Sequence, residues 1–351
     1  MEAPEIDAFG VTFRYEESEE PLDEVALVQE VLLPRAAVPL RRGTDGDARW
    51  TLRFGRPPVR RFEYRFELSF ADGRREAILD PANARRAPGA FGERSVVEFP
   101  DYRAPPFVCS RAPQGEVRGL SLPSALLGAD QPAMLWSSYG SDSTTPLPVL
   151  VVLDGIEFAG FSGLLQMLDW AVAGRRLPQM RALLLHPTER NVHYSANPLL
   201  AEALLEEILP AASRVASLAA GPRWRAGLGA SLGALALLHA HRLRPELFGA
   251  LYLQSGTFIE RGYLGTMEYA DRIEGFVEDV LSRPSWPDPI PVEMTCGAVE
   301  ENLGSNKAAR TALRRQGYSA HLHVMPDAHN WIAWRDAWLP HLPALLRKAW
   351  R

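Results

Sequence analysis

Residues 224–243 have the sequence WRAGLGASLGALALLHAHRL, in which a Gly-x-Ser-x-Gly motif at 229–233 separates a short apolar run from a stretch rich in alanine and leucine. The alanines and leucines favour a helix, and the apolar run before them is typical of a short strand. Glycines two positions before and after Ser231 leave room for a sharp turn between strand and helix. We therefore predict a nucleophile elbow that exposes the Ser231 hydroxyl at the carboxyl end of a sheet.

Two later segments supply partners for this serine in the order Ser, Asp or Glu, then His, which is the chain order of an α/β-hydrolase. Residues 296–300, CGAVE, are typical of a strand that ends in Glu300. Residues 321–329, HLHVMPDAH, begin as an alternating strand and continue into a loop that carries His329. We expect His329 to accept and return the serine proton, and a buried Glu300 to hold and stabilise the imidazole.

Alternatives remain for the acid, whereas the rival histidines are poorer candidates for the base. Glu301 follows Glu300 directly but would point the other way if the strand continued, and Asp327 or no acid at all is a further alternative. Six other histidines are poorer candidates: two lie on the elbow helix (His239, His241), two precede the serine (His186, His193), and two share one face of a strand (His321, His323). A metal site built from His321, His323 and His329 is disfavoured, because no acidic or cysteine cluster joins them in the sequence. No metal and no organic cofactor are expected.

The oxyanion of an acyl-transfer reaction also needs backbone donors. The first should be the N–H of Leu232, the residue after the nucleophile. The second should come from the loop that follows the apolar run at 147–153, which is Asp154-Gly155-Ile156. Glycine allows a close approach of the backbone, so we expect the N–H of Gly155 or Ile156 to serve, although a plain turn is the alternative.

Bulk composition excludes several classes of protein. The chain has 351 residues, a net charge of −5 and two cysteines. A nucleic-acid partner would call for a basic excess, and two cysteines do not make a disulfide framework. The start is acidic and unlike a signal peptide, and no run approaches the roughly 20 apolar residues of a membrane span. We expect a soluble, intracellular protein that binds neither nucleic acid nor a membrane.

The residue pattern changes along the chain, which predicts two domains, at 1–112 and 113–351. Phe62, Tyr64, Phe66, Leu68 and Phe70 alternate with polar residues, as in a half-buried strand. Asp72-Gly73 predicts the turn of a hairpin, and further alternating runs before residue 100 favour a small antiparallel sandwich. The proline-rich stretch at 100–106 is typical of a linker.

The second region has the pattern of an α/β fold with a mainly parallel sheet. A continuous apolar run at 147–153 indicates a strand that is covered on both faces, and the stretches at 182–185, 250–253 and 292–296 look similar. Helical segments are expected between them at 199–218, 232–243 and 308–316, and a last helix at about 331–350. Such alternation predicts helices on both faces of the sheet.

Several stretches, in their order and spacing, resemble the enterochelin esterases and the wider group of esterases around them. The resemblance covers roughly residues 115–350, with a separate one at the beginning of the chain. The stretches of the second region are 153–155, 177–178, Arg190 with Asn197, 207–210, 245–249, 254–256, 297–300, and 329–331 with Trp334 and Arg335. Those of the first are 11–15, Trp50, 63–66, 72–73 and 80–83, which resemble the amino-terminal, immunoglobulin-like sandwich of these esterases.

The resemblance implies a cytoplasmic serine esterase that opens the ester bonds of a siderophore trilactone or of its iron complex. Arg190 would then clamp a catecholate or carboxylate of the substrate, unless it forms an ion pair with Glu189 or another neighbour. Aromatic residues between two strands, Phe258, Tyr263, Tyr269 and Trp286, suit a pocket for aryl groups or the core.

Two departures from the family pattern leave other substrates open: Ala234 stands where a second glycine is usual, and Asn330 where aspartate is common. The alternatives are a feruloyl or acetyl esterase of the same fold and a non-catalytic binding protein with a hydrolase-like shell.

Overall fold

The computed structural model describes residues 3–17, 20–44, 48–259 and 269–351. They form two compact units. The first contains Met1–Ala104, Gly297–Glu301 and Met325–Ala333, and the second contains Pro105–Cys296, Asn302–Val324 and Trp334–Arg351. The short segments with Glu300 and His329 thus belong to the same unit as the amino-terminal strands.

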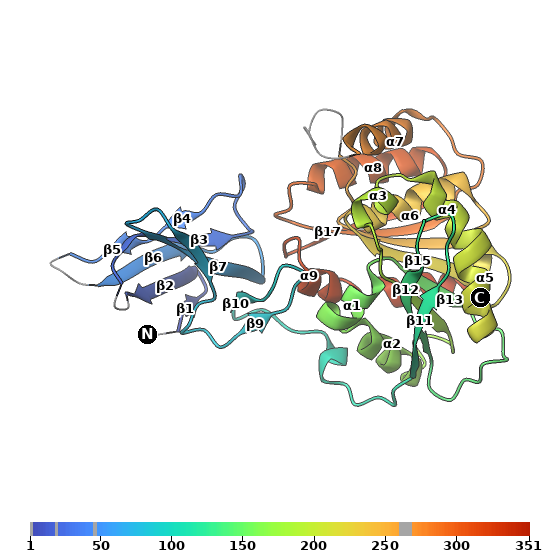
Figure 1. Ribbon diagram of the computed structural model, residues 1–351, viewed down its shortest axis with the longest axis horizontal. Helices are drawn as coiled ribbons and strands as arrows, with labels where there is room; N and C mark the ends of the chain where they lie inside the picture. The colour runs from blue at the N-terminus through green and yellow to red at the C-terminus, as the bar shows by residue number, and fades with distance from the viewer. Residues whose placement is uncertain (1–2, 18–19, 45–47, 260–268) are drawn as a thin grey trace. The chain divides into compact units, whose positions relative to one another are not determined.

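The first unit is built on two antiparallel sheets, as the alternating sequence predicts (Figure 1). One sheet has the order β1-β2-β6-β5, and the other has the order β4-β3-β7-β10-β9, with β8 paired to β7. The strands are β1 (Glu5–Asp7), β2 (Gly10–Glu16), β3 (Leu22–Gln29), β4 (Val38–Pro39), β5 (Arg41–Arg42), β6 (Arg49–Gly55), β7 (Arg61–Phe70), β8 (Arg75–Ile78), β9 (Arg86–Ala87) and β10 (Arg94–Glu98).

Strand β7 carries the core of this unit on one face. Its five apolar residues from Phe62 to Phe70 are all buried, and Phe13 of β2 contacts Phe62, Tyr64 and Phe66 edge to face. The opposite face differs from the expectation of a solvated polar face at its first two positions: Arg61 is 1% exposed and Glu63 is 4% exposed. These charges are buried because they pair with each other and with groups outside the strand, which are described with the site.

The second unit contains one eight-stranded sheet of order β11-β12-β14-β13-β15-β16-β17-β18 (Figure 1). The contacts from β14 through β13, β15 and β16 to β17 are parallel, and β11 and β12 join antiparallel at one edge. The strands are β11 (Glu116–Leu122), β12 (Gln131–Ser137), β13 (Val149–Val152), β14 (Arg181–Leu185), β15 (Arg225–Ala230), β16 (Ala250–Gln254), β17 (Pro291–Gly297) and β18 (Ser319–Met325).

Helices cover this sheet as the apolar runs predict. Val149 and Val151 of β13 join one large core, and Leu150 and Val152, which point to the other face, are also fully buried. The helices are η1 (Pro106–Cys109), α1 (Gly155–Ser162), α2 (Leu164–Ala173), α3 (Arg190–Tyr194), α4 (Pro198–Ala203), η2 (Leu204–Ile208), α5 (Leu209–Val215), η3 (Pro222–Trp224), α6 (Leu232–Leu243), α7 (Ala270–Ser282), α8 (Leu303–Arg315), α9 (Trp331–Asp336) and α10 (His341–Ala349).

Some sequence expectations need correction. The single helix expected at 331–350 is two helices, α9 and α10, with Pro340 between them. Proline lacks a backbone N–H, and its ring clashes with the preceding turn in a helix interior, so the helix is interrupted before Pro340. Strands β11 and β12 were not predicted: the apolar residues of β11 are scattered, whereas the apolar run at 133–136 in β12 was a missed signal. Among the described residues, no helix combines the length and the apolar composition that crossing a bilayer requires.

Candidate active site

Ser231 occupies the elbow that its sequence predicts, between the end of β15 and the start of α6. Its backbone has φ 55° and ψ −122°, a region that non-glycine residues rarely adopt. A Cβ on Gly229 would lie 2.7 Å from the carbonyl carbon of Gly233, so the strand and the helix can only approach this closely through a glycine. The Ser231 N–H donates to the carbonyl of Gln254 in β16 over 2.9 Å, which ties the turn to the next strand.

The Ser231 side chain lies beside a second hydroxyl. Its Oγ is 3.2 Å from Oγ1 of Thr257, and the Thr257 N–H donates to the Ser231 carbonyl over 3.2 Å. Leu232, next in the chain, is the first residue of α6. Backbone N–H groups in the first turn of a helix have no acceptor inside the helix, and the positive end of the helix dipole favours a negative charge there. This is the environment that an oxyanion needs.

The Asp154–Ile156 segment, expected as a loop, adjoins the elbow, and its Gly155 and Ile156 lie in the first turn of helix α1. A Cβ on Gly233 would meet Asp154 Oδ2 and Leu153 Cβ, each at 3.5 Å, which shows that the two segments lie next to each other. Helix α1 begins at Gly155, and a Cβ on that residue would lie only 2.4 Å from the Cα of Leu184. Gly155 is therefore required by packing. The two segments predicted to supply the oxyanion donors are neighbours within one unit.

Arg190, the predicted substrate-binding residue, forms a two-pronged ion pair at this loop. Its Nε donates to Asp154 Oδ1 over 2.8 Å and its Nη2 to Asp154 Oδ2 over 2.7 Å. The Asp154 N–H also donates to the hydroxyl of Tyr194 over 3.2 Å. Asp154, itself at φ 52°, is thus held by three hydrogen bonds to two residues, which fixes the start of α1. This neighbour, and not Glu189, is the ion-pair partner of Arg190.

His329 and Glu300 form a pair in the first unit. His329 Nδ1 is 2.7 Å from Glu300 Oε2, and Glu300 Oε1 accepts the N–H of Gly297 over 2.6 Å. The Glu300 side chain is 1% exposed and that of His329 is 25% exposed, so the imidazole can be reached while the carboxylate is shielded. Glu301 is 41% exposed and pairs with Arg35 over 3.4 Å. Of the acids that the sequence left open, Glu300 is the one that pairs with His329.

The residue after His329 joins the buried charges of β7. Arg61 Nη1 donates to Asn330 Oδ1 over 2.9 Å, and Asn330 Nδ2 donates to Glu30 Oε1 over 2.9 Å. Arg61 also donates to Glu63 over 3.0 Å, and the Glu63 N–H donates to Glu30 over 2.9 Å. These four residues form one connected and buried network, which we call the Arg61 network. It fastens the His329 segment to the sandwich strands within one unit.

The predicted site residues therefore fall into two groups. Ser231, Leu232, Gly155, Ile156 and Arg190 belong to the second unit, and Glu300 and His329 belong to the first.

Of the predicted pocket aromatics, Phe258 is buried and Tyr269 and Trp286 are partly buried, whereas Tyr263 lies outside the described residues. Thr257 and the Arg61 network were not found from the sequence, because isolated polar residues carry no periodic signal.

The second unit has the α/β-hydrolase fold, with the serine elbow after a central strand of a mainly parallel sheet. No known protein-family profile matches the chain. It is 26% identical over 209 residues, 57% of its length, to the iron(III) enterobactin esterase of Dickeya dadantii, and the match spans about half (48%) of that relative. A crystal structure of enterochelin esterase from Shigella flexneri superposes with a TM-score of 0.82 at 19% identity, covering 100% of this chain and 97% of that one.

A more distant structure also shares the hydrolase fold. A ferulic acid esterase superposes with a TM-score of 0.55 at 18% identity and covers 67% of this chain and 99% of its own. The likeness to the enterochelin esterases that the sequence indicated is therefore confirmed, both in sequence and in fold, and extends over the sandwich as well as the hydrolase unit.

A pH dependence of stability follows from the Arg61 network. Burial and the nearby Glu63 raise the pKa of Glu30 from 4.5 to about 8. Between these values the unfolded chain releases a proton that the folded chain keeps, so rising pH favours unfolding. The stability that protonated Glu30 provides is thus complete below about pH 4.5 and lost as pH rises through about 8. Glu30→Gln keeps a side-chain oxygen that can accept the same hydrogen bonds but does not titrate. Its free energy of unfolding should therefore fall less than that of the wild type between pH 4.5 and 8.

Urea unfolding at pH 5, 7 and 8.5 measures the effect. Glu24→Gln, at an exposed position in β3, is the matched control and should follow the wild type at every pH. A Glu30→Gln variant whose loss of stability with pH parallels that of the wild type would contradict a protonated Glu30.

Proposed function

We propose that this protein is a serine esterase in which Ser231 attacks the carbonyl carbon of a carboxylic ester. The observation that carries the proposal is the strained backbone of Ser231 in the elbow between β15 and α6. A serine held this way, beside the N-terminus of a helix, is the arrangement that acyl-transfer enzymes of this fold use. The shielded Glu300, paired with His329, supports a role for His329 as the base that accepts the Ser231 proton.

The proposed reaction has two acyl-transfer steps. His329 accepts the Ser231 proton through Nε2 as Oγ bonds to the ester carbon, and Glu300 stabilises the imidazolium through Nδ1. The tetrahedral oxyanion is held by the N–H of Leu232 and that of Gly155 or Ile156. The C–O bond to the alcohol then breaks, the alcohol takes the proton from His329, and an acyl-enzyme remains. Water repeats the sequence and releases the acid.

We propose a siderophore trilactone, free or as its iron complex, as the substrate. The support comes from similar proteins: the Dickeya dadantii relative is named an iron(III) enterobactin esterase, and the Shigella flexneri enzyme was crystallised in the presence of enterobactin. Arg190 is the proposed cation for an anionic catecholate, which its Nη1 would have to bind because its Nε and Nη2 donate to Asp154. A feruloyl-type ester is the second candidate, which the ferulic acid esterase fold favours. The cytoplasmic location stays a prediction.

Ser231→Ala should abolish ester hydrolysis and leave the fold intact. His329→Ala should do the same, and the double variant should be little slower than either, because residues that act as one unit are not additive. In a well-studied serine protease such losses reach about 10⁶ in turnover. The measurement is the hydrolysis of a catecholate trilactone, a feruloyl ester and a p-nitrophenyl ester, with folding checked by circular dichroism. A Ser231→Ala rate above about a tenth of the wild-type rate would remove this serine from the mechanism.

The neighbouring pair Glu300 and Glu301 provides a matched test of the acid. Glu300→Gln should lower kcat clearly, because the amide cannot stabilise the imidazolium by charge. Glu301→Gln should behave as the wild type, since its exposed carboxylate pairs with Arg35. Steady-state rates of the two variants on the same ester decide the matter, and a larger loss in Glu301→Gln would refute the assignment.

A further inference from the structure

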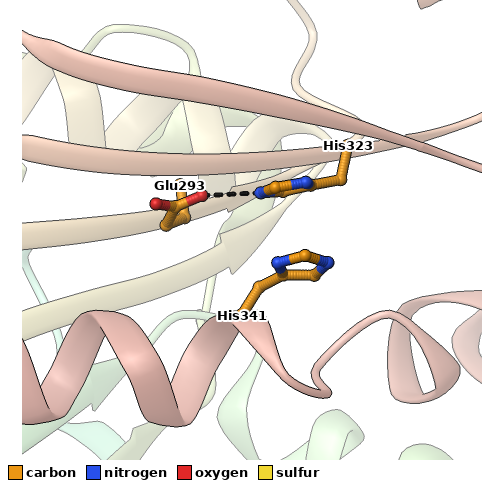
Figure 2. Close-up of side chains that lie close together, drawn as sticks. All are labelled: Glu293, His323 and His341. Carbon is orange, nitrogen blue, oxygen red and sulfur yellow. Dashed lines mark hydrogen bonds and ion pairs between the residues drawn. The ribbon is translucent and has the colours of Figure 1, made fainter.

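A group of histidines meets one carboxylate at the edge of the second unit's sheet, apart from the residues proposed for catalysis. Glu293 lies on β17, His321 and His323 lie on the edge strand β18, and His341 is the first residue of α10. Glu293 Oε2 is 2.7 Å from His323 Nε2, and Glu293 Oε1 is 3.1 Å from His321 Nδ1. Figure 2 shows Glu293 and His323 on adjacent strands and His341 reaching towards them from the helix.

The third imidazole is stacked on the second. The ring centroids of His323 and His341 are 3.5 Å apart and their planes differ by 19°. Two imidazolium ions would repel each other in this arrangement, so the stack requires at least one neutral ring. A neutral imidazole is the form that binds a metal.

The donor atoms are close enough for one ion. One ligand atom from each of Glu293, His323 and His341 lies within 4.8 Å of the other two. Zinc binds imidazole nitrogen and carboxylate oxygen at about 2.0–2.2 Å. The lone pairs of two stacked rings lie in nearly parallel planes, so the His341 ring would have to turn out of the stack to share one ion with His323. The ion would replace the proton shared by Glu293 and His323, and that proton leaves to solvent. All three side chains are partly exposed, so an ion has access from solvent.

We propose that Glu293, His323 and His341 bind a divalent transition-metal ion of the zinc class, with His321 or water as the fourth ligand. Two or three imidazoles with one carboxylate suit zinc, cobalt or nickel better than calcium or magnesium, which prefer all-oxygen sites. The ion would tie β17, the edge strand β18 and the C-terminal helix together. Its role is structural: it would stabilise the strand from which the chain continues towards His329. The proposal does not depend on ester hydrolysis.

The sequence pointed to only half of this site. The spacing of His321 and His323 puts both on one face of a strand, but the missing acidic partner comes from β17 and not from neighbouring residues. Because Glu293 and His323 lie 30 residues apart, only the sheet pairing brings them together.

The test is Zn²⁺ binding by the full-length, tag-free protein after treatment with EDTA. Isothermal titration calorimetry should give one tight equivalent, and added Zn²⁺ should raise the midpoint of thermal unfolding, since an ion that binds only the folded state stabilises it. Glu293→Gln, His323→Gln and His341→Gln should each weaken binding by more than about tenfold, the least that even supporting residues of metal sites contribute. His186→Gln is the matched control, because His186 also pairs with one carboxylate, Glu157, and should bind as the wild type does.

X-ray absorption of the Zn²⁺-loaded wild type gives a readout that needs no variant to fold. It should show nitrogen and oxygen neighbours at about 2.0–2.2 Å with the signature of imidazole. Binding no tighter in the wild type than in His341→Gln, an equal loss in His186→Gln, or a sulfur shell from Cys109 or Cys296 would each overturn the proposal.

Discussion

The contact between Gly229 and Gly233 is the constraint on which the hydrolase unit depends. Because no side chain fits between the end of β15 and the first turn of α6, the two elements approach closely and Ser231 takes a positive φ. Strand β15 lies between β13 and β16. The carboxyl ends of these parallel strands meet at one edge, so the loops that begin at Asp154 and Ser255 flank the serine. The glycine contact and the strand order together therefore bring the Ser231 hydroxyl, the N-terminus of α6 and the first turn of α1 to one place.

The His329 segment has a different kind of support. Its pair with Glu300 is shielded, and its neighbour Asn330 is bonded to Arg61 and Glu30, which lie in or beside sandwich strands. Leaving a buried polar group without its hydrogen-bond partner costs roughly 1–3 kcal/mol, so these contacts hold the segment in one conformation. Val299 and Ala328 also belong to the hydrophobic core of the sandwich. This gives the sandwich a physical role in orienting the histidine, in addition to any contact with substrate.

The parts of the fold that the sequence predicted are those with a local signal. The local conformation of the backbone can be predicted from a few neighbouring residues in three places: the elbow motif, the alternating residues of β7 and the apolar runs of the parallel strands. The buried state of Arg61 and the meeting of Glu293 with His323 depend on partners far along the chain, so no local pattern reveals them. The choice between Glu300 and Glu301 is of the same kind, because two adjacent residues differ only in which one faces His329.

The reactivity of Ser231 is the central claim, and active-site labelling with a fluorophosphonate probe followed by peptide mass spectrometry tests it most directly. A fluorophosphonate reacts with a serine only where a base and an oxyanion site activate it. The account predicts one modified residue, Ser231, with labelling lost in Ser231→Ala and greatly slowed in His329→Ala. A wild-type protein that stays unlabelled while fully folded would contradict the account and indicate a binding protein with a hydrolase fold.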